Sequence, residues 1–297
     1  MMRKSMIALA GALAFAQPAF AEQPWEQAVA SAIGKPGTEM AGGVYKIGLP
    51  RSDLHVTLDG VQLKPALALG SWLAFVSHGA GEASVMGDLV LTDAEVNPVM
   101  AKLVEGGIEI TALHNHLLRN SPHTMYMHVG GHGDPAKLAI LLHDALALSG
   151  TPLTAPEAAG PPALETLDLD VAALDGIMKH KGKPGGGVLG YSIPRAEAPK
   201  EGGMAIPPAL GAAIAINFQP TGSGKAAITG DFVLTASEVN PVLKTLRDNG
   251  IEVTALHNHM LNDEPRMFFL HFWAIGDGTK LARGLAAALA HVAIAPG

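Results

Sequence analysis

Six of the 13 histidines fall into two sets with the same internal spacing. In each set an H-x-H pair is followed, 12 residues after its second histidine, by a third one; the residues are His114, His116 and His128, and His257, His259 and His271. Side chains two apart on a β-strand lie on one face, and a hairpin centred near Pro122 or Pro265 brings the third histidine opposite the second. Three imidazole nitrogens at about 2.0–2.1 Å hold Zn²⁺ or Cu²⁺ and leave a fourth position open. The spacing therefore predicts a three-histidine site for zinc or copper in each set.

The same pattern also has a structural interpretation, because a duplication copies packed histidines as faithfully as metal ligands. Other polar and aromatic residues near the two sets have structural explanations as well. Helix capping accounts for Glu95, Glu238, Asp134 and Asp277, and turn capping at strand ends accounts for Asp88 and Asp231. Exposure in loops accounts for His123 and His132, and packing in a core or pocket wall accounts for Phe269, Phe272 and Trp273.

The chain contains an internal repeat. Residues 87–117 and 230–260 align without gaps at an offset of 143, and 20 of the 31 positions are identical. This similarity indicates a tandem duplication. The expected organisation is a signal peptide at 1–21, a repeat domain at 22–150, a Pro/Ala/Gly-rich linker at 151–164 and a second repeat domain at 165–297.

The elements of each copy can be predicted from periodicity and capping signals. In the first copy we expect strands at 71–77 and 83–91, a helix that begins at Thr92 or at Asn97-Pro98 and ends at Gly106, strands at 108–116 and 125–129, and a helix at 135–148. The order ββαββα, used twice, predicts an α+β fold with mostly antiparallel sheet and ferredoxin-like character. Strict alternation along 108–116 puts both histidines on the apolar, core-side face.

Composition narrows the classes of function. Hydrophobic residues make up 48% of the chain and charged residues 16%, which predicts a large buried core. The formal charge of −7 argues against a nucleic-acid partner. The absence of cysteine from the sequence excludes disulfides and thiolate metal sites.

The N-terminus has the features of an export signal. Arg3 and Lys4 precede an apolar run at residues 6–16, and Ala19-Phe20-Ala21 forms an A-x-A cleavage site. We expect cleavage after Ala21 and a periplasmic or secreted protein. The apolar run is shorter than the roughly 20 residues of a membrane-spanning helix, so no membrane span is expected.

The sequence resembles the LppY/LpqO family of exported bacterial proteins. The resemblance rests on the paired G-D-x-V-L-T-x-x-E-V-N-P and E-[IV]-T-A-L-H-N-H blocks and the G-D motif that follows them, and it covers nearly all of the mature chain. It implies export and a duplicated fold, and it implies no particular chemistry. The namesakes are lipoproteins, but no cysteine stands near the cleavage site, so lipid anchoring does not carry over.

Three functions remain open from the sequence. The first is a periplasmic protein that binds zinc or copper through the six histidines. The second is a zinc metalloenzyme of hydrolase or lyase type, in which the same site holds a metal-bound water. The third is a metal-free module that binds a small molecule of the envelope. The sequence shows no dedicated catalytic base at convincing spacing, which favours binding over catalysis.

Overall fold

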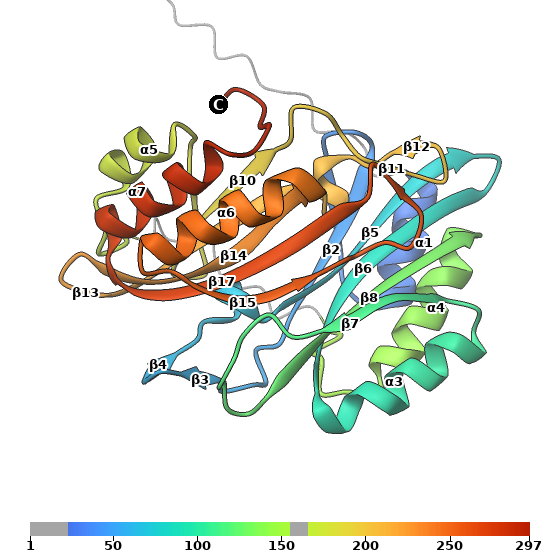
Figure 1. The fold of residues 1–297 in the computed structure, drawn as a ribbon. Helices are drawn as coiled ribbons and strands as arrows, with labels where there is room; N and C mark the ends of the chain where they lie inside the picture. The colour runs from blue at the N-terminus through green and yellow to red at the C-terminus, as the bar shows by residue number, and fades with distance from the viewer. Residues whose placement is uncertain (1–22, 155–165) are drawn as a thin grey trace, which may run out of the picture.

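The computed structural model describes residues 23–154 and 166–297 of the chain. Over these residues the chain forms two similar halves, each built on a six-stranded antiparallel sheet (Figure 1). The strand orders are β1-β2-β5-β6-β8-β7 and β15-β17-β14-β13-β10-β9, so the second sheet has the same order as the first. The predicted α+β fold with tandem duplication is confirmed. The expected signal peptide and most of the expected linker lie outside the described residues.

The first half contains α1 (Pro24–Ile33), β1 (Thr38–Met40), β2 (Val44–Pro50), β3 (Thr57–Leu58), β4 (Val61–Gln62), α2 (Pro65–Ala68), β5 (Gly70–Gly79), β6 (Glu82–Thr92), α3 (Asp93–Glu105), β7 (Glu109–His114), β8 (Thr124–Gly133) and α4 (Pro135–Leu146). The predicted ββαββα unit corresponds to β5 through α4, and β1 and β2 extend its sheet at one edge. Since β6 and β7 both run antiparallel to β8, they are parallel to each other, and α3 is the crossover between them.

The second half contains α5 (Val171–Met178), β9 (Lys183–Gly185), β10 (Val188–Pro194), β11 (Lys200–Glu201), β12 (Met204–Ala205), a 3-10 turn η1 (Pro208–Leu210), β13 (Ala213–Gly222), β14 (Lys225–Thr235), α6 (Ala236–Asp248), β15 (Glu252–His257), β16 (Asp263–Glu264), β17 (Met267–Asp277) and α7 (Gly278–Leu289). Of the described helices, none combines the length and the apolarity needed to cross a membrane.

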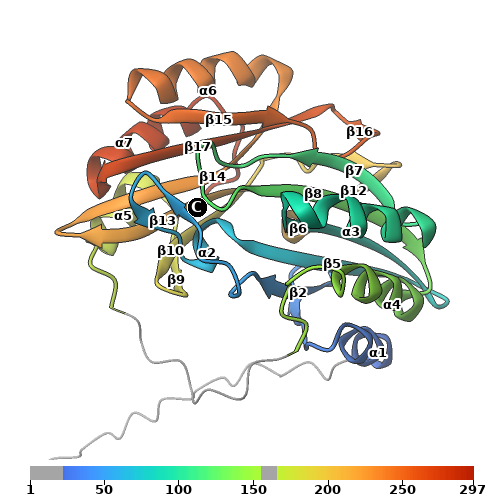
Figure 2. The same ribbon diagram turned by 90° about the horizontal axis from the view of Figure 1, so that it is seen from below.

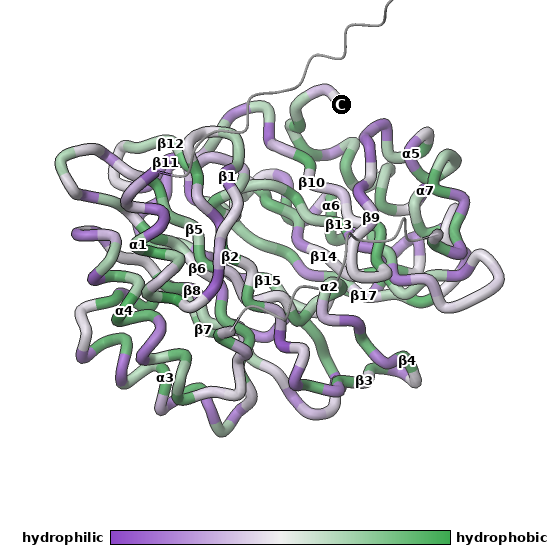
Figure 3. Tube along the Cα trace, turned by 180° about the vertical axis from the view of Figure 1, so that it is seen from behind, coloured by the Kyte–Doolittle hydropathy of each residue, from purple (hydrophilic) through white to green (hydrophobic). Residues whose placement is uncertain are grey.

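The helices cover the outer faces of the sheets, and the inner faces meet (Figure 2). One core packs α1, α3 and α4 on the first sheet, and another packs α5, α6 and α7 on the second. A third apolar cluster joins the halves, with members such as Leu58, Leu63, Tyr126 and Trp273. In Figure 3 the strands are largely apolar, whereas the outer helices alternate between apolar and polar residues. The hydrophobic faces of the helices therefore bury one side of each sheet, and the contact between the halves buries the other side.

Of the two predicted starts for the helix after β6, the structure has the one at Thr92 and not the one at Asn97-Pro98. Thr92 and Glu95 form a capping box, so α3 begins at Asp93 and Pro98 lies inside the helix. The same box recurs at Thr235 and Glu238 before α6. The last helix of each half is capped by an aspartate side chain, as expected; these residues are Asp134 and Asp277.

The histidine strand differs from the prediction in register and in face. Ala112 pairs with His128 and His114 pairs with Tyr126, four residues away from the expected register, and β7 ends at His114. A β-bulge between Ile110 and Ala112 breaks the alternation. Ile110 therefore packs toward the helices, while His114 lies on the inner face that meets the other half. The assignment of both histidines to the core-side face was wrong for this reason.

A buried ion pair supports each capping box. The Arg51 guanidinium is 1% exposed, donates to Glu95 over 2.8 and 3.0 Å, and donates to the Val90 carbonyl over 2.7 Å. Arg195 repeats the arrangement with Glu238. Guanidinium binds carboxylate through two parallel hydrogen bonds, which an ammonium group cannot reproduce.

We therefore expect Arg51→Lys to lower the free energy of unfolding by about 1.5–3 kcal/mol, the usual value of a hydrogen bond to a charged group. Urea denaturation measures this change. Arg283→Lys is the control, since Arg283 is exposed on α7 and its replacement should stay within about 0.5 kcal/mol. Equal midpoints for the two variants would contradict a supporting role of the buried pair.

Candidate metal centre

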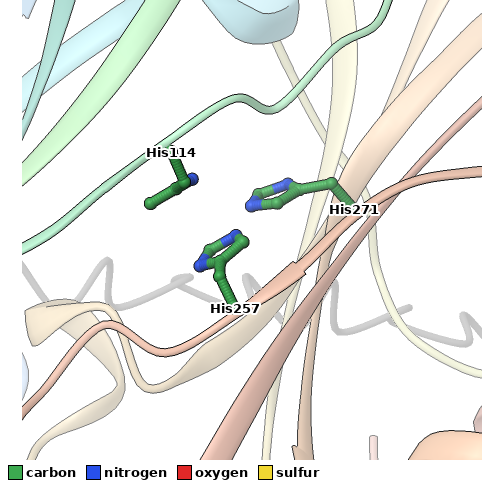
Figure 4. A group of neighbouring side chains, drawn as sticks. All are labelled: His114, His257 and His271. Atoms are coloured by element: carbon green, nitrogen blue, oxygen red, sulfur yellow. The ribbon is translucent and has the colours of Figure 1, made fainter.

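The six predicted histidines meet in one cluster between the two sheets. Each ring stacks on a ring from the other half: His114 on His257 at 3.4 Å between centroids, His116 on His271 at 3.7 Å, and His128 on His259 at 3.7 Å. His114 and His257 are equivalent in the repeat, so this pair lies on the approximate twofold axis that relates the halves. Figure 4 shows His114 with His257 and His271, whose rings come from opposite sides toward one another.

Different elements position the members of each set. His114 and His257 end the edge strands β7 and β15, and His128 and His271 lie in the longer strands β8 and β17. His116 follows β7 by two residues, and its ring stacks on Tyr126 at 3.4 Å. His259 stacks on Phe269 in the same way, also at 3.4 Å. An aromatic residue of the neighbouring strand thus orients the histidine that no strand holds.

Two aspartates face the histidines. Asp88 pairs with His128 across β6 and β8, and Asp231 pairs with His271 across β14 and β17. Sequence analysis placed these aspartates at strand ends as turn caps, which was wrong: both lie inside strands, on the inner face. The signal that could have revealed them is a carboxylate in an apolar strand, found at the same position of both copies.

The imidazole hydrogen bonds fix the orientation of the rings. The Nδ1 atoms of His114 and His257 lie 3.2 Å from the carbonyls of Asn115 and Asn258, and Nδ1 of His271 lies 2.8 Å from the Gly230 carbonyl. A carbonyl only accepts, so Nδ1–H donates and Nε2 carries the free lone pair. Among the residues described, all six Nε2 atoms are buried without a hydrogen-bond partner. Backbone-held Nδ1 and a free Nε2 are the arrangement of metal-binding histidines.

The carboxylate distances are those of shared ligands rather than of hydrogen bonds. Asp88 lies 3.8 Å from Nε2 of His116 and 3.9 Å from Nε2 of His128. Asp231 lies 3.6 and 3.8 Å from the equivalent atoms of His259 and His271. Two ligands of one tetrahedral ion, each about 2.0–2.1 Å from it, are about 3.4 Å apart. A small cation between each aspartate and its histidines therefore fits the spacing.

Within residues 23–154 and 166–297, three groups have ligand atoms that lie within 4.8 Å of one another. They are His114, His116 and His128; His114, His257 and His271; and Asp231, His259 and His271. The first is the predicted set of the first half. The second combines residues of both halves, and His114 belongs to two groups. The structure thus brings all six predicted residues together, but in one shared centre instead of two separate ones.

Burial sets the protonation of the cluster. It lowers the pKa of His114 to about 4 and that of His257 to about 3, and the pKa values of the other four histidines fall well below 6.5. It raises the pKa of Asp88 to about 8 and that of Asp231 well above 3.8. The histidines are therefore neutral at pH 7, which is the state that binds a metal.

A cavity of about 290 Å³ reaches the centre from one side. Its lining includes Lys46, Trp72 and Asp88 of the first half and Asp231 of the second. The Lys46 ammonium lies 3.9 Å from the centroid of the Trp72 ring, and burial lowers its pKa to about 8. In the first half Trp72 pairs with Asp88, whereas in the second half the residue paired with Asp231 is Ala215. The Lys46–Trp72 side of the cavity is therefore not repeated in the second half. Sequence analysis missed Lys46 because nothing in the repeat marks it.

The two histidines found only in the first copy lie outside the centre. His123 is 45% exposed and pairs with Asp93, and His132 is 61% exposed and lies 3.4 Å from Glu82. Both are exposed, as expected, but His132 lies in strand β8 and not in a loop.

The comparisons with known proteins identify a family but no activity. The family model described as Domain of Unknown Function (DUF1259) matches twice, over residues 27–148 and 172–291. No curated protein matches the chain. Two solved structures are similar over 86% of this chain and 89% of theirs: a trimeric bacterial microcompartment shell protein, PduB, at 13% identity and a TM-score of 0.22, and EtuB from Clostridium kluyveri at 12% and 0.24. These scores are too low to support an argument about function.

Proposed function

Because the chain belongs to the DUF1259 family through both of its halves, and because its histidines meet between those halves, we propose that it is an exported protein that binds a divalent transition metal, zinc or copper. The observation that carries the proposal is the set of six buried Nε2 atoms without a partner among the described residues, together with the unpartnered Oδ1 atoms of Asp88 and Asp231. Leaving so many buried polar atoms unpaired is costly, and a bound cation would satisfy them together.

The donor set selects the type of metal. Imidazole nitrogens with a minority of carboxylates suit zinc and copper, whereas calcium and magnesium prefer oxygen ligands. Export, the other part of the proposal, rests on the basic, apolar and A-x-A pattern of residues 1–21.

Elemental analysis of the protein as purified should find at least one zinc or copper ion per chain. After treatment with a chelator, addition of ZnCl₂ should raise the unfolding temperature by about 5–10 °C, since ligand at 100 times its Kd contributes about 2.7 kcal/mol. MgCl₂ at the same concentration is the control and should change nothing. A protein that purifies without metal and responds equally to both salts would rule the proposal out.

A second candidate, a zinc-dependent hydrolase or lyase, is favoured by the 290 Å³ cavity beside the centre. Catalytic zinc keeps one position for water or substrate, and this cavity leaves room for it. Cobalt substitution tests the point, because the visible spectrum of bound Co²⁺ should shift when azide enters an open position. An unchanged spectrum would argue against the enzyme and leave metal binding as the proposed function.

A further inference from the structure

A second cavity, of about 670 Å³, lies between the halves and shares no lining residue with the cavity at the metal centre. Its apolar wall comes from both halves and includes Val76, Met86, Ile206, Leu210 and Met260. This volume is within the usual range of small-molecule sites.

The cavity exists because the repeat is broken at one position. Trp273 of β17 is 2% exposed, belongs to the apolar cluster that joins the halves, and donates from its indole to Asp59 over 3.0 Å. The equivalent residue of β8 is Gly130. A Cβ atom at Gly130 would contact only Thr111 at 3.6 Å and Glu109 at 4.0 Å. The first half therefore has open space where the second half has an indole ring.

The charged residues around Trp273 and around Gly130 also differ. Beside Trp273, Glu252 pairs with Arg119 over 2.8 Å, and Arg119 also pairs with Asp59 over 3.1 Å. The equivalents of Glu252 and Arg119 at the cavity are Glu109 and Asn262, so the arginine is lost while the glutamate remains. Glu109 has no ion-pair partner in residues 23–154 and 166–297.

A second carboxylate and an unpaired hydroxyl also line this cavity. Glu201 accepts a hydrogen bond from the backbone N–H of Asn262 through Oε1, while its Oε2 is buried without a partner in the described chain. Burial is the main cause of the raised pKa of Glu201, and the nearby Asp263 and Glu109 carboxylates add to it, while the Asn262 hydrogen bond and the charge of Arg266 oppose it. The Thr111 hydroxyl is buried and likewise has no partner among the described residues, whereas its equivalent Thr254 donates to the His116 carbonyl.

We propose that this cavity binds a small organic cation, an amine or quaternary ammonium compound with an apolar body. Its positive group would lie between Glu109 and Glu201, where the equivalent site beside Trp273 has the guanidinium of Arg119. Its apolar body would lie in the space that the Trp273 ring fills at that equivalent site. None of the described residues that line the cavity is a lysine or arginine, and its basic side chains are those of His78 and His132. The nearby Arg266 pairs with Asp263 over 3.0 Å.

The test is titration calorimetry of the full mature protein with n-hexylammonium, and with hexanoate as a probe of equal length and opposite charge. Hexylammonium should bind at least about tenfold more tightly, because hydrogen bonds to charged groups contribute about 1.5–3 kcal/mol each. Replacing both carboxylates, Glu109→Gln with Glu201→Gln, should lower the affinity at least about tenfold. Glu252→Gln is the matched control, since that glutamate lies outside the cavity, and it should leave binding unchanged.

Two further variants carry residues of the other half into the cavity. Gly130→Trp should abolish binding by filling the space, and Asn262→Arg should weaken it at least about tenfold by supplying the missing positive charge. If Gly130→Trp does not fold, Asn262→Arg and the carboxylate pair decide the result. Equal affinity for the two probes, or full affinity after loss of both carboxylates, would overturn the proposal.

Discussion

Alanine at both His116 and His259 should lower the affinity for zinc by at least about 10²-fold and leave the fold intact. Loss of a partner outside the ligand shell costs roughly 10–100-fold in metal affinity, and loss of a ligand costs at least as much. Each of these histidines has an unpaired Nε2 within 4 Å of an aspartate oxygen, at 3.8 Å for His116 and 3.6 Å for His259. Neither lies in a strand, so their removal should spare the sheets.

Competition with a chelator of known affinity measures this loss, and circular dichroism reports the fold. The matched control is His123→Ala with His132→Ala, two exposed histidines outside the centre, which should keep full zinc affinity. Unchanged affinity in the His116/His259 variant would place the metal elsewhere. Loss of folding in that variant would instead indicate that the histidines are structural.

The metal-free protein should lose stability steeply between pH 6.5 and pH 4. The folded-state pKa of His114, about 4, lies below its unfolded value of about 6.5, so the unfolded state binds more protons in this range. Stability that is present above pH 6.5 is therefore lost as the pH falls. At pH 5 the loss is on the order of 2 kcal/mol for His114, and it is similar for His257.

The aspartates act in the opposite direction. The folded-state pKa of Asp88 is raised to about 8, so its contribution to the free energy of unfolding rises by roughly 3 kcal/mol as the pH falls from 7 to 5. The pKa of Asp231 is raised as well, and its contribution changes in the same direction. Lys46, the nearest ammonium, remains charged throughout this range because its pKa is about 8. Because the pKa values of six histidines are lowered and those of only two aspartates are raised, the net effect of lowering the pH is a loss of stability.

Urea midpoints at pH 7 and pH 5, measured in chelator, test this prediction. The variant that carries phenylalanine at both 114 and 257 keeps two stacked rings on the axis and removes two titrating groups, so its midpoint should fall less. A wild-type midpoint that is equal at both pH values would contradict neutral, buried histidines.

The histidines were predictable because their spacing is local and repeated. A difference of four residues in register is even, so His128 stayed on the face of His114 although the predicted pairing was wrong. The bulge at Thr111 was not predictable, because nothing in an E-[IV]-T-A-L-H run marks an extra residue. That bulge decides whether the histidines meet the helices or the other half.

The shared nature of the centre could not be read from the sequence either. Spacing within one hairpin carries no information about contacts between halves, and the stacking of His114 on His257 depends on how two sheets pack. Lys46 and Gly130 were missed for a related reason. Each of these residues differs from its equivalent in the other half. Such a difference can be interpreted only when the structure shows what the equivalent residue contacts.

The most direct test of a metal centre shared by the two halves is an anomalous-difference map, recorded at the zinc absorption edge, from crystals of the zinc-loaded protein. The expected result is a peak between the inner faces of the sheets, within about 2.0–2.1 Å of Nε2 atoms from both halves. A peak coordinated only by residues of one half, or one at the exposed pair of His123 and Asp93, would contradict it.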